Sequence, residues 1–180
     1  KSHYTFYPEM GIAGMAPRIT NKSYTISVEA SYTPGDEGIL IAAGCHAGGY
    51  AIFIEDGKLK YHYNYLADRH FDLEAAAEIS TGTHTFAFDF VHTGENRGVG
   101  HLLIDGEKVS KPILIALFPL FAISGGMAIG RYSTSVVKSS HKPKGYFKYT
   151  GKIYRADYEL ERPEDDMDLM IEAEQELLKA

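Results

Sequence analysis

The sequence predicts an all-β protein, an antiparallel β-sandwich followed by a short C-terminal α-helix. The evidence is two Asp-Gly pairs between apolar runs, strands in which apolar and polar residues alternate, and an amphipathic helical pattern near the end of the chain. We expect one sandwich domain over residues 1–162 and a helix over residues 163–180 that packs on this domain or on a neighbouring one. A sandwich of this size buries a sufficient core without disulfides.

Asp56-Gly57 and Asp105-Gly106 each predict the turn of a hairpin. A type I′ turn needs positive φ at both central residues, which Asp-Gly accommodates. The first turn fixes the facing pairs of its hairpin, which are Glu55 and Lys58, Ile54 and Leu59, Ile52 and Tyr61, and Tyr50 and Tyr63. Side chains alternate along a strand, so Tyr61 and Tyr63 are predicted to face inward and His62 outward.

The other elements are predicted from composition and from the alternation of side chains. Strands are expected over 24–32 (half-buried), 39–43 (covered on both faces), 85–91 (in the core) and 146–160 (closing the sheet), and residues 113–130 are expected to form two strands separated by a break at Pro119. Loops are expected over 92–100 and, as a polar loop, over 131–145. Residues 1–22 are predicted as an extended, loop-rich lead-in, and 66–78 as an irregular crossing or one turn of helix. Gly44, Gly48 and Gly49 are expected to interrupt the sheet as a bulge or a close backbone approach.

The helix is predicted to begin at Pro163, since proline is favoured at the first helical position and acids in the first turn. The stripe Met167, Met170, Ile171, Glu174, Leu177 and Leu178 predicts its apolar face. The acids from Glu164 to Asp168 lack the ligand spacing of an EF-hand, so a helix start is preferred over a calcium site.

The charge balance argues against a nucleic-acid-binding protein. The formal net charge is −6, and the most basic segment, Lys138 to Lys148, is interpreted as a solvated loop. No apolar run is long enough to cross a bilayer. Because the chain starts at Lys1 without methionine and shows no targeting segment, we expect a fragment or a processed product, which leaves a periplasmic, secreted or cytoplasmic location open.

No catalytic or metal site is predicted. Cys45 adjoins His46, but neighbouring strand residues point to opposite faces, which disfavours a nucleophile and base pair. The strand acids stand singly, and Asp72 and Glu74, which have the two-residue spacing of some glycosidase carboxylates, are interpreted as solvated charges in an irregular segment. The eight histidines show no metal-ligand spacing.

Aromatic content is the best sign of binding, with thirteen tyrosines and nine phenylalanines. The segment Tyr61-His62-Tyr63-Asn64-Tyr65 is a candidate platform for stacking on sugar rings. Because the hairpin register turns Tyr61 and Tyr63 inward, His62, Asn64 and Tyr65 are the candidate ligand-binding residues.

The order of several short motifs resembles the C-terminal accessory domain of bacterial arylsulfatases, a concanavalin A-like jelly-roll sandwich. The matching pieces are Thr5-Phe-Tyr-Pro8, Asn21-Lys-Ser-Tyr-Thr-Ile26, Gly38-Ile-Leu40, Gly48-Gly-Tyr50, Asp56-Gly-Lys-Leu-Lys-Tyr-His-Tyr-Asn64, Gly82-Thr-His-Thr-Phe86, Ile104-Asp-Gly-Glu-Lys-Val109 and Phe147-Lys-Tyr-Thr-Gly-Lys-Ile153. The resemblance implies a non-catalytic domain that packs on a catalytic sulfatase domain of the same polypeptide, where it can contact a sulfated ester or glycan.

Sulfatases of this class use a formylglycine made within Cys/Ser-x-Pro-x-Arg, together with calcium. Cys45 begins Cys-His-Ala-Gly-Gly and does not match that motif. The chain itself is therefore expected to be neither an enzyme nor a cofactor protein. Two alternatives stay open, a free-standing lectin-like carbohydrate-binding module and a catalytic sandwich such as a glycosidase or lyase.

Overall fold

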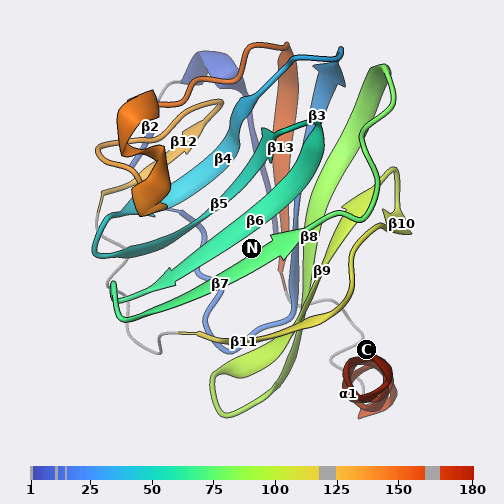
Figure 1. Ribbon diagram of the computed structural model, residues 1–180. Helices are drawn as coiled ribbons and strands as arrows, with labels where there is room; N and C mark the ends of the chain where they lie inside the picture. Colours follow the sequence, from blue (N-terminus) through green and yellow to red (C-terminus); the bar gives the residue numbers. More distant parts are fainter. Residues whose placement is uncertain (1, 11, 15, 118–124, 161–166) are drawn as a thin grey trace.

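The protein is an antiparallel β-sandwich of two sheets with one α-helix, seen in a computed structural model that describes all residues except 1, 11, 15, 118–124 and 161–166 (Figure 1). Sheet A contains, in spatial order, β1 (His3–Phe6), β13 (Ile153–Leu160), β3 (Tyr24–Tyr32), β8 (Gly82–Gly94), β9 (Arg97–Ile104) and β10 (Glu107–Lys108), with β11 (Ile113–Ala116) also paired to β9. Sheet B contains β2 (Ile12–Ala13), β12 (Met127–Ile129), β4 (Gly38–Cys45), β5 (Gly48–Glu55), β6 (Lys58–Tyr65) and β7 (Arg69–Glu74). The helices are the 3-10 turns η1 (Pro8–Met10) and η2 (Ser139–Lys144) and the α-helix α1 (Met167–Lys179).

Both Asp-Gly hairpins are confirmed. β5 and β6 pair in the predicted register, with Ile54 opposite Leu59 and Tyr50 opposite Tyr63. Asp56 and Gly57 have φ values of 55° and 74°, as a type I′ turn requires. The strand over 24–32 is also confirmed, and its residues alternate strictly between buried and half-buried.

Several segments that were predicted as loops form strands instead. The lead-in supplies an edge strand to each sheet, β1 beside β13 and β2 beside β12. Residues 69–74 form β7, paired along β6. The edge of the sheet offers hydrogen-bond partners to this backbone, whereas a helix this short would be only marginally stable on propensity alone. The predicted loop over 92–100 is a tight hairpin, with its turn at Glu95 and Asn96, both at positive φ.

The glycines after Ala43 do not interrupt sheet B. Gly44 pairs with Gly49 and Cys45 with Gly48, so the strands run on to a two-residue turn. A Cβ on Gly49 would lie 2.1 Å from the carbonyl oxygen of Ala43, so the predicted close backbone approach is present there. The two strands predicted between residues 113 and 130 are present as β11 and β12. The predicted break at Pro119 lies outside the described residues.

The core lies between the sheets and is rich in aromatic rings. Tyr61 of sheet B stacks on Phe88 of sheet A, with ring centroids 3.7 Å apart and planes within 5°. The hydroxyls of Tyr50 and Tyr158 join the sheets through a hydrogen bond of 2.6 Å. The predicted inward orientation of the tyrosines of β6 is therefore confirmed.

Residues 131–145, predicted as a polar loop, are not solvated over their whole length, and the closing strand predicted over 146–160 begins only at Ile153. We call residues 131–149 the covering segment. It lies against the outer face of sheet B, as Figure 1 shows in orange. Its buried side chains Tyr132, Val136, Val137 and Phe147 pack on Ile39, Ala42, Ala51 and Phe53 of β4 and β5. Burial of both faces of β4 explains why that strand is apolar throughout.

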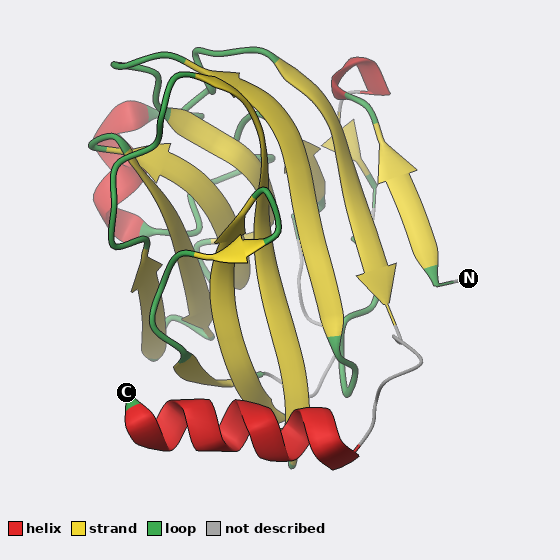
Figure 2. Cartoon of the chain, turned by 90° about the vertical axis from the view of Figure 1, so that its right-hand side faces the viewer, coloured by secondary structure: helices red, strands yellow, loops and turns green. Residues whose placement is uncertain are grey.

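Helix α1 packs on the outer face of sheet A, and Figure 2 shows it running across the strands at one end of the sandwich. Its Met170, Ala173 and Leu177 contact Val91 and Val99 of β8 and β9. Ile171 and Leu178, assigned to the apolar stripe, are exposed, so the buried stripe is narrower than predicted. The predicted start at Pro163 and its acids up to Asp166 lie outside the described residues. Among the helices described, none is long and apolar enough to span a membrane.

Candidate functional site

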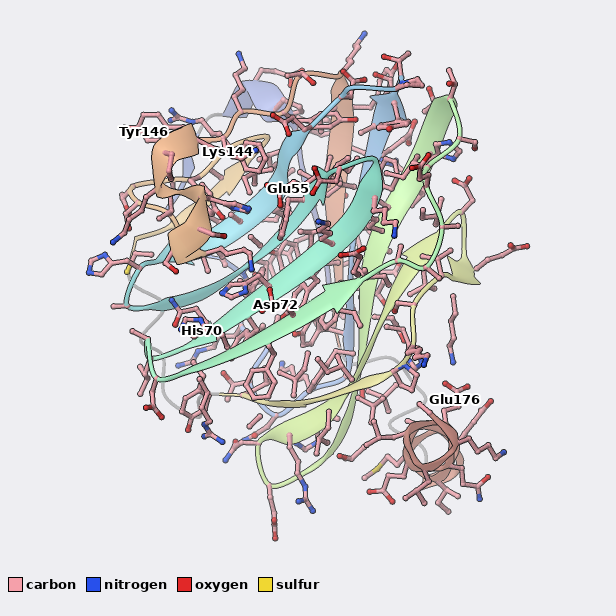
Figure 3. The ribbon with its side chains drawn as sticks, in the orientation of Figure 1. Glu55, His70, Asp72, Lys144, Tyr146 and Glu176 are labelled. Carbon is pink, nitrogen blue, oxygen red and sulfur yellow. The ribbon has the colours of Figure 1, made fainter. Side chains whose placement is uncertain are left out.

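His62 lies on β6, facing the outer side of sheet B, but its ring is only 3% exposed. Its Nδ1 lies 2.8 Å from Oδ1 of Asp72, and its Nε2 lies 3.2 Å from Nδ1 of His70 (Figure 3). Lys138 of the covering segment contacts the same Asp72 oxygen at 2.7 Å. Both ring nitrogens of His62 are thus engaged within the protein.

Asn64 is equally buried, and its side-chain amide links three segments. Its Nδ2 donates to the carbonyl oxygens of His46 and Val137, both at 3.0 Å, and its Oδ1 accepts from the backbone N–H of Ala67 at 2.7 Å. Tyr65 is partly buried under the guanidinium of Arg69, 4.3 Å from its ring centroid. A ligand-binding role for His62, Asn64 and Tyr65 stays a prediction, and the polar atoms of the first two serve the fold.

Asp72 and Glu74 lie on a strand, not in an irregular segment, so both side chains point to the same face. Hydrogen bonds from His62 and Lys138, opposed by partial burial, hold the pKa of Asp72 well below its usual value. Glu74 pairs with Lys58 at 3.1 Å. Both carboxylates are thus held by basic side chains of the fold itself, and the general acid of raised pKa that a glycosidase also needs is not Asp72.

Other candidates from the sequence are accounted for by packing. Cys45 is buried, and Nδ1 of the neighbouring His46 lies 3.4 Å from Oγ of Ser135 in the covering segment. Within the part of the chain that the structure describes, no three His, Cys, Asp or Glu side chains are grouped so as to hold a metal ion. The formylglycine and calcium of a parent sulfatase stay predictions about sequence outside this chain.

A pocket of about 320 Å³ opens at one edge of the sandwich, where β12 of sheet B and β13 of sheet A approach each other. We call it the edge pocket. Its lining combines η1, the end of β12 and the segment leading into β13, and it comprises Pro8, Ile129, Gly130, Arg131, Lys148, Tyr149, Gly151 and Ile153. Residues far apart in the sequence therefore meet around one concave surface.

Backbone conformation and close contacts explain why positions 130 and 151 of this lining are glycine. Gly130 has a φ of 76°, a conformation that other residues rarely adopt. A Cβ on Gly151 would come within 2.6 Å of the Tyr149 ring and 2.7 Å of the carbonyl oxygen of Ser31. The Tyr149 hydroxyl donates to that same oxygen at 2.6 Å, which fixes the ring in the wall of the pocket.

Exposed tyrosines adjoin the edge pocket. Tyr7 precedes its Pro8, Tyr154 follows its Ile153, and the three tyrosines most exposed in the described structure are Tyr7, Tyr146 and Tyr154. The ring of Tyr146, 54% exposed, lies with its centroid 5.0 Å from the guanidinium carbon of Arg131. Figure 3 shows Tyr146 on the covering segment near Lys144. Aromatic rings beside a pocket with some polar side chains are what a sugar-binding surface requires.

The sequence contains a signal for the edge pocket, which the interpretation of Lys138 to Lys148 as a solvated loop did not use. Between residues 131 and 155 there is no acidic residue, and the basic side chains are Arg131, Lys138, Lys142, Lys144, Lys148, Lys152 and Arg155. Such a segment is unusual in a chain with a net charge of −6.

Comparisons with known proteins identify the fold. No protein-family model matches the chain, and no curated protein does. Among solved structures, the carbohydrate-binding module (CBM40) of an IT-sialidase from Ruminococcus gnavus superposes with a TM-score of 0.56 at 12% identity, over 96% of this chain and 97% of that one. The same module with α2,3-sialyllactose bound gives a TM-score of 0.53 at 14% identity, over 96% of both chains.

An intramolecular trans-sialidase from leech also matches, with a TM-score of 0.54 at 13% identity, over 96% of this chain but 27% of that enzyme. At these identities the likeness establishes the jelly-roll sandwich fold and no more. None of these three structures is a sulfatase accessory domain, so the predicted membership of that family is not supported by them.

Proposed function

We propose that this chain is a carbohydrate-binding, lectin-like module that holds one sugar residue of a glycan in the edge pocket. The observation that carries the proposal is the pocket itself, whose lining combines apolar residues with Arg131 and Lys148 and which adjoins exposed tyrosines. Its volume is at the small end of the range for ligand pockets, roughly 300–1,000 Å³, and suits a single sugar ring.

The fold gives independent support. A module of the same fold, covered almost completely by this chain, binds sialyllactose. The alternative of a sulfatase accessory domain concerns the rest of a longer protein, and no feature of the described residues favours it.

Titration of the ¹⁵N-labelled chain with a panel of neutral and acidic oligosaccharides, followed by NMR, tests the proposal. We expect one or more glycans to shift the amide signals of residues 129–131 and 148–153, with a Kd on the order of 0.1–1 mM for a single-sugar site. Tyr146→Ala should raise that Kd about fivefold to tenfold, since it removes an exposed stacking ring worth ~1 kcal/mol.

Leu178→Ala is the matched control, because it truncates a side chain that is 87% exposed on α1, away from the edge pocket. It should leave the Kd unchanged. A panel in which no glycan shifts any signal would refute the function. Shifts confined to other surfaces, unaffected by Tyr146→Ala, would refute this location.

A further inference from the structure

We infer that the edge pocket selects acidic sugars, with Arg131 and Lys148 holding a carboxylate or sulfate group. The inference rests on the proposed function and specifies its ligand class. The pocket contains two cationic residues and no carboxylate among its lining residues. An anion entering it therefore meets positive charge alone at first contact.

Two basic side chains of the covering segment, Lys138 and Lys144, are paired with carboxylates of the protein. Lys138 is paired with Asp72 at 2.7 Å, and Lys144 is paired with Glu37 and Glu55, both at 3.4 Å. Arg131, Lys142 and Lys148, in contrast, form no ion pair within the described part of the chain, and of these three Arg131 and Lys148 line the edge pocket. An acidic protein supplies many carboxylates, so leaving both cations of its pocket unpaired keeps their charge available to a ligand.

Tyr146 holds the guanidinium of Arg131 in place. The cation lies over the ring face at 5.0 Å, a contact that orients the guanidinium without using its N–H groups. An oriented guanidinium binds a carboxylate or sulfate through two parallel hydrogen bonds, which are stronger than bonds between neutral groups. Lys148 adds a second charge on the same pocket.

Asp36 and Glu37, which lie beside Thr150 between the lining residues Tyr149 and Gly151, are engaged by other partners. Asp36 accepts hydrogen bonds from the hydroxyl of Thr150 at 2.9 Å and from the backbone N–H of Thr33 at 2.8 Å. Glu37 receives Lys144. Both carboxylates therefore interact with partners other than Arg131.

Three related ligands test the inference, namely 3′-sialyllactose, 3′-sulfated lactose and lactose, titrated by NMR against the intact chain. We expect at least one acidic ligand to bind about tenfold or more tightly than lactose, and its affinity to fall as NaCl is raised from about 50 to 500 mM. The ratio between the carboxylated and sulfated ligands shows which anion the pocket prefers.

The double variant Arg131→Gln/Lys148→Gln should reduce that preference to twofold or less. Arg131→Lys should retain part of it, since a lysine keeps the charge but loses the paired hydrogen bonds. Lys111→Gln is the matched control, because it removes one positive charge from an exposed position between β10 and β11. Thermal unfolding of each variant verifies that the fold is retained.

The outcomes separate this inference from the proposed function. If neutral glycans bind at the edge pocket as tightly as acidic ones, or if the double variant keeps the preference, acid selection is wrong while glycan binding stands. If no acidic or neutral glycan binds, both fail. If acidic ligands bind more tightly and the double variant removes the difference, both are supported.

Discussion

Two neighbouring polar residues on β6, His62 and Asn64, illustrate how burial changes the role of a side chain. Both face away from the core, where an open sheet would expose them to ligand. The covering segment 131–149 closes over them and uses their polar atoms, through Val137 for Asn64 and through the Asp72–Lys138 pair for His62. Arg131, at the start of that segment, pairs with no acid of the described residues and lines the edge pocket.

Asn64→Ala is expected to reduce the free energy of unfolding by about 2–4 kcal/mol. The substitution removes three hydrogen bonds, of which the one to the carbonyl of Val137 is buried and those to His46 and Ala67 are partly buried. Urea denaturation measures the loss, with Lys111→Ala as a surface control expected to change stability by less than about 0.5 kcal/mol. Equal stabilities for the two variants would show that the amide network is unimportant to the fold.

At the scale of elements, the covering segment is held on sheet B by one buried histidine as well as by apolar residues. His141 of η2 is 1% exposed and lies between the rings of Phe53 and Phe147, each 4.7 Å from its own. Its Nδ1 lies 2.5 Å from the Tyr132 hydroxyl. Burial lowers the pKa of His141 to about 4, opposed by Glu55 and assisted by Lys138 and Lys144.

Acidification is therefore expected to destabilise the protein through His141. Between pH 6.5 and pH 4 the unfolded chain takes up a proton at this residue and the folded chain does not, so stability falls as pH falls, by on the order of 2–4 kcal/mol. His141→Phe should flatten the dependence of unfolding free energy on pH across this window. The comparison concerns slopes, because the substitution also removes the contact with Tyr132.

His3→Gln provides the histidine control for that experiment, since its side chain is 55% exposed at the start of β1. The slope of this variant between pH 6.5 and pH 4 is the reference with which the slope of His141→Phe is compared. A slope that His141→Phe leaves unchanged would mean that other groups, such as His101, whose pKa burial also lowers, dominate the acid response.

At the scale of the whole molecule, stability depends on contacts between the two sheets. One core extends through both of them, and it contains no tryptophan, so tyrosine and phenylalanine rings supply the largest buried surfaces. The stacked pair of Tyr61 and Phe88 and the bonded hydroxyls of Tyr50 and Tyr158 each join one sheet to the other. Rigid sheets fix the relative positions of the segments that line the edge pocket.

Phe88→Ala is expected to lower the free energy of unfolding by about 3–5 kcal/mol, because it leaves a cavity between the sheets and removes the ring that Tyr61 stacks on. Phe71→Ala on the edge strand β7 should cost less, since Phe71 is only partly buried. Guanidinium denaturation followed by tyrosine fluorescence measures both. Comparable losses would show that the stacked pair is not central to the core.

The sequence alone determined the features that depend on local sterics and on the alternation of side chains along a strand. Asp-Gly pairs set two turns, and alternation set the face of each residue in 24–32 and 50–63, including the inward tyrosines. These follow from backbone conformations available to neighbouring residues, so no distant contact is needed to predict them.

Only the tertiary structure decided which segments pair, and which polar faces stay open. Residues 69–74 became a strand because β6 offered an edge, and 131–149 became a cover because the outer face of β4 and β5 is apolar. The edge pocket unites Pro8, residues 129–131 and residues 148–153. A pattern read along the chain is local, whereas burial and pocket formation depend on segments that meet only after the two sheets have packed.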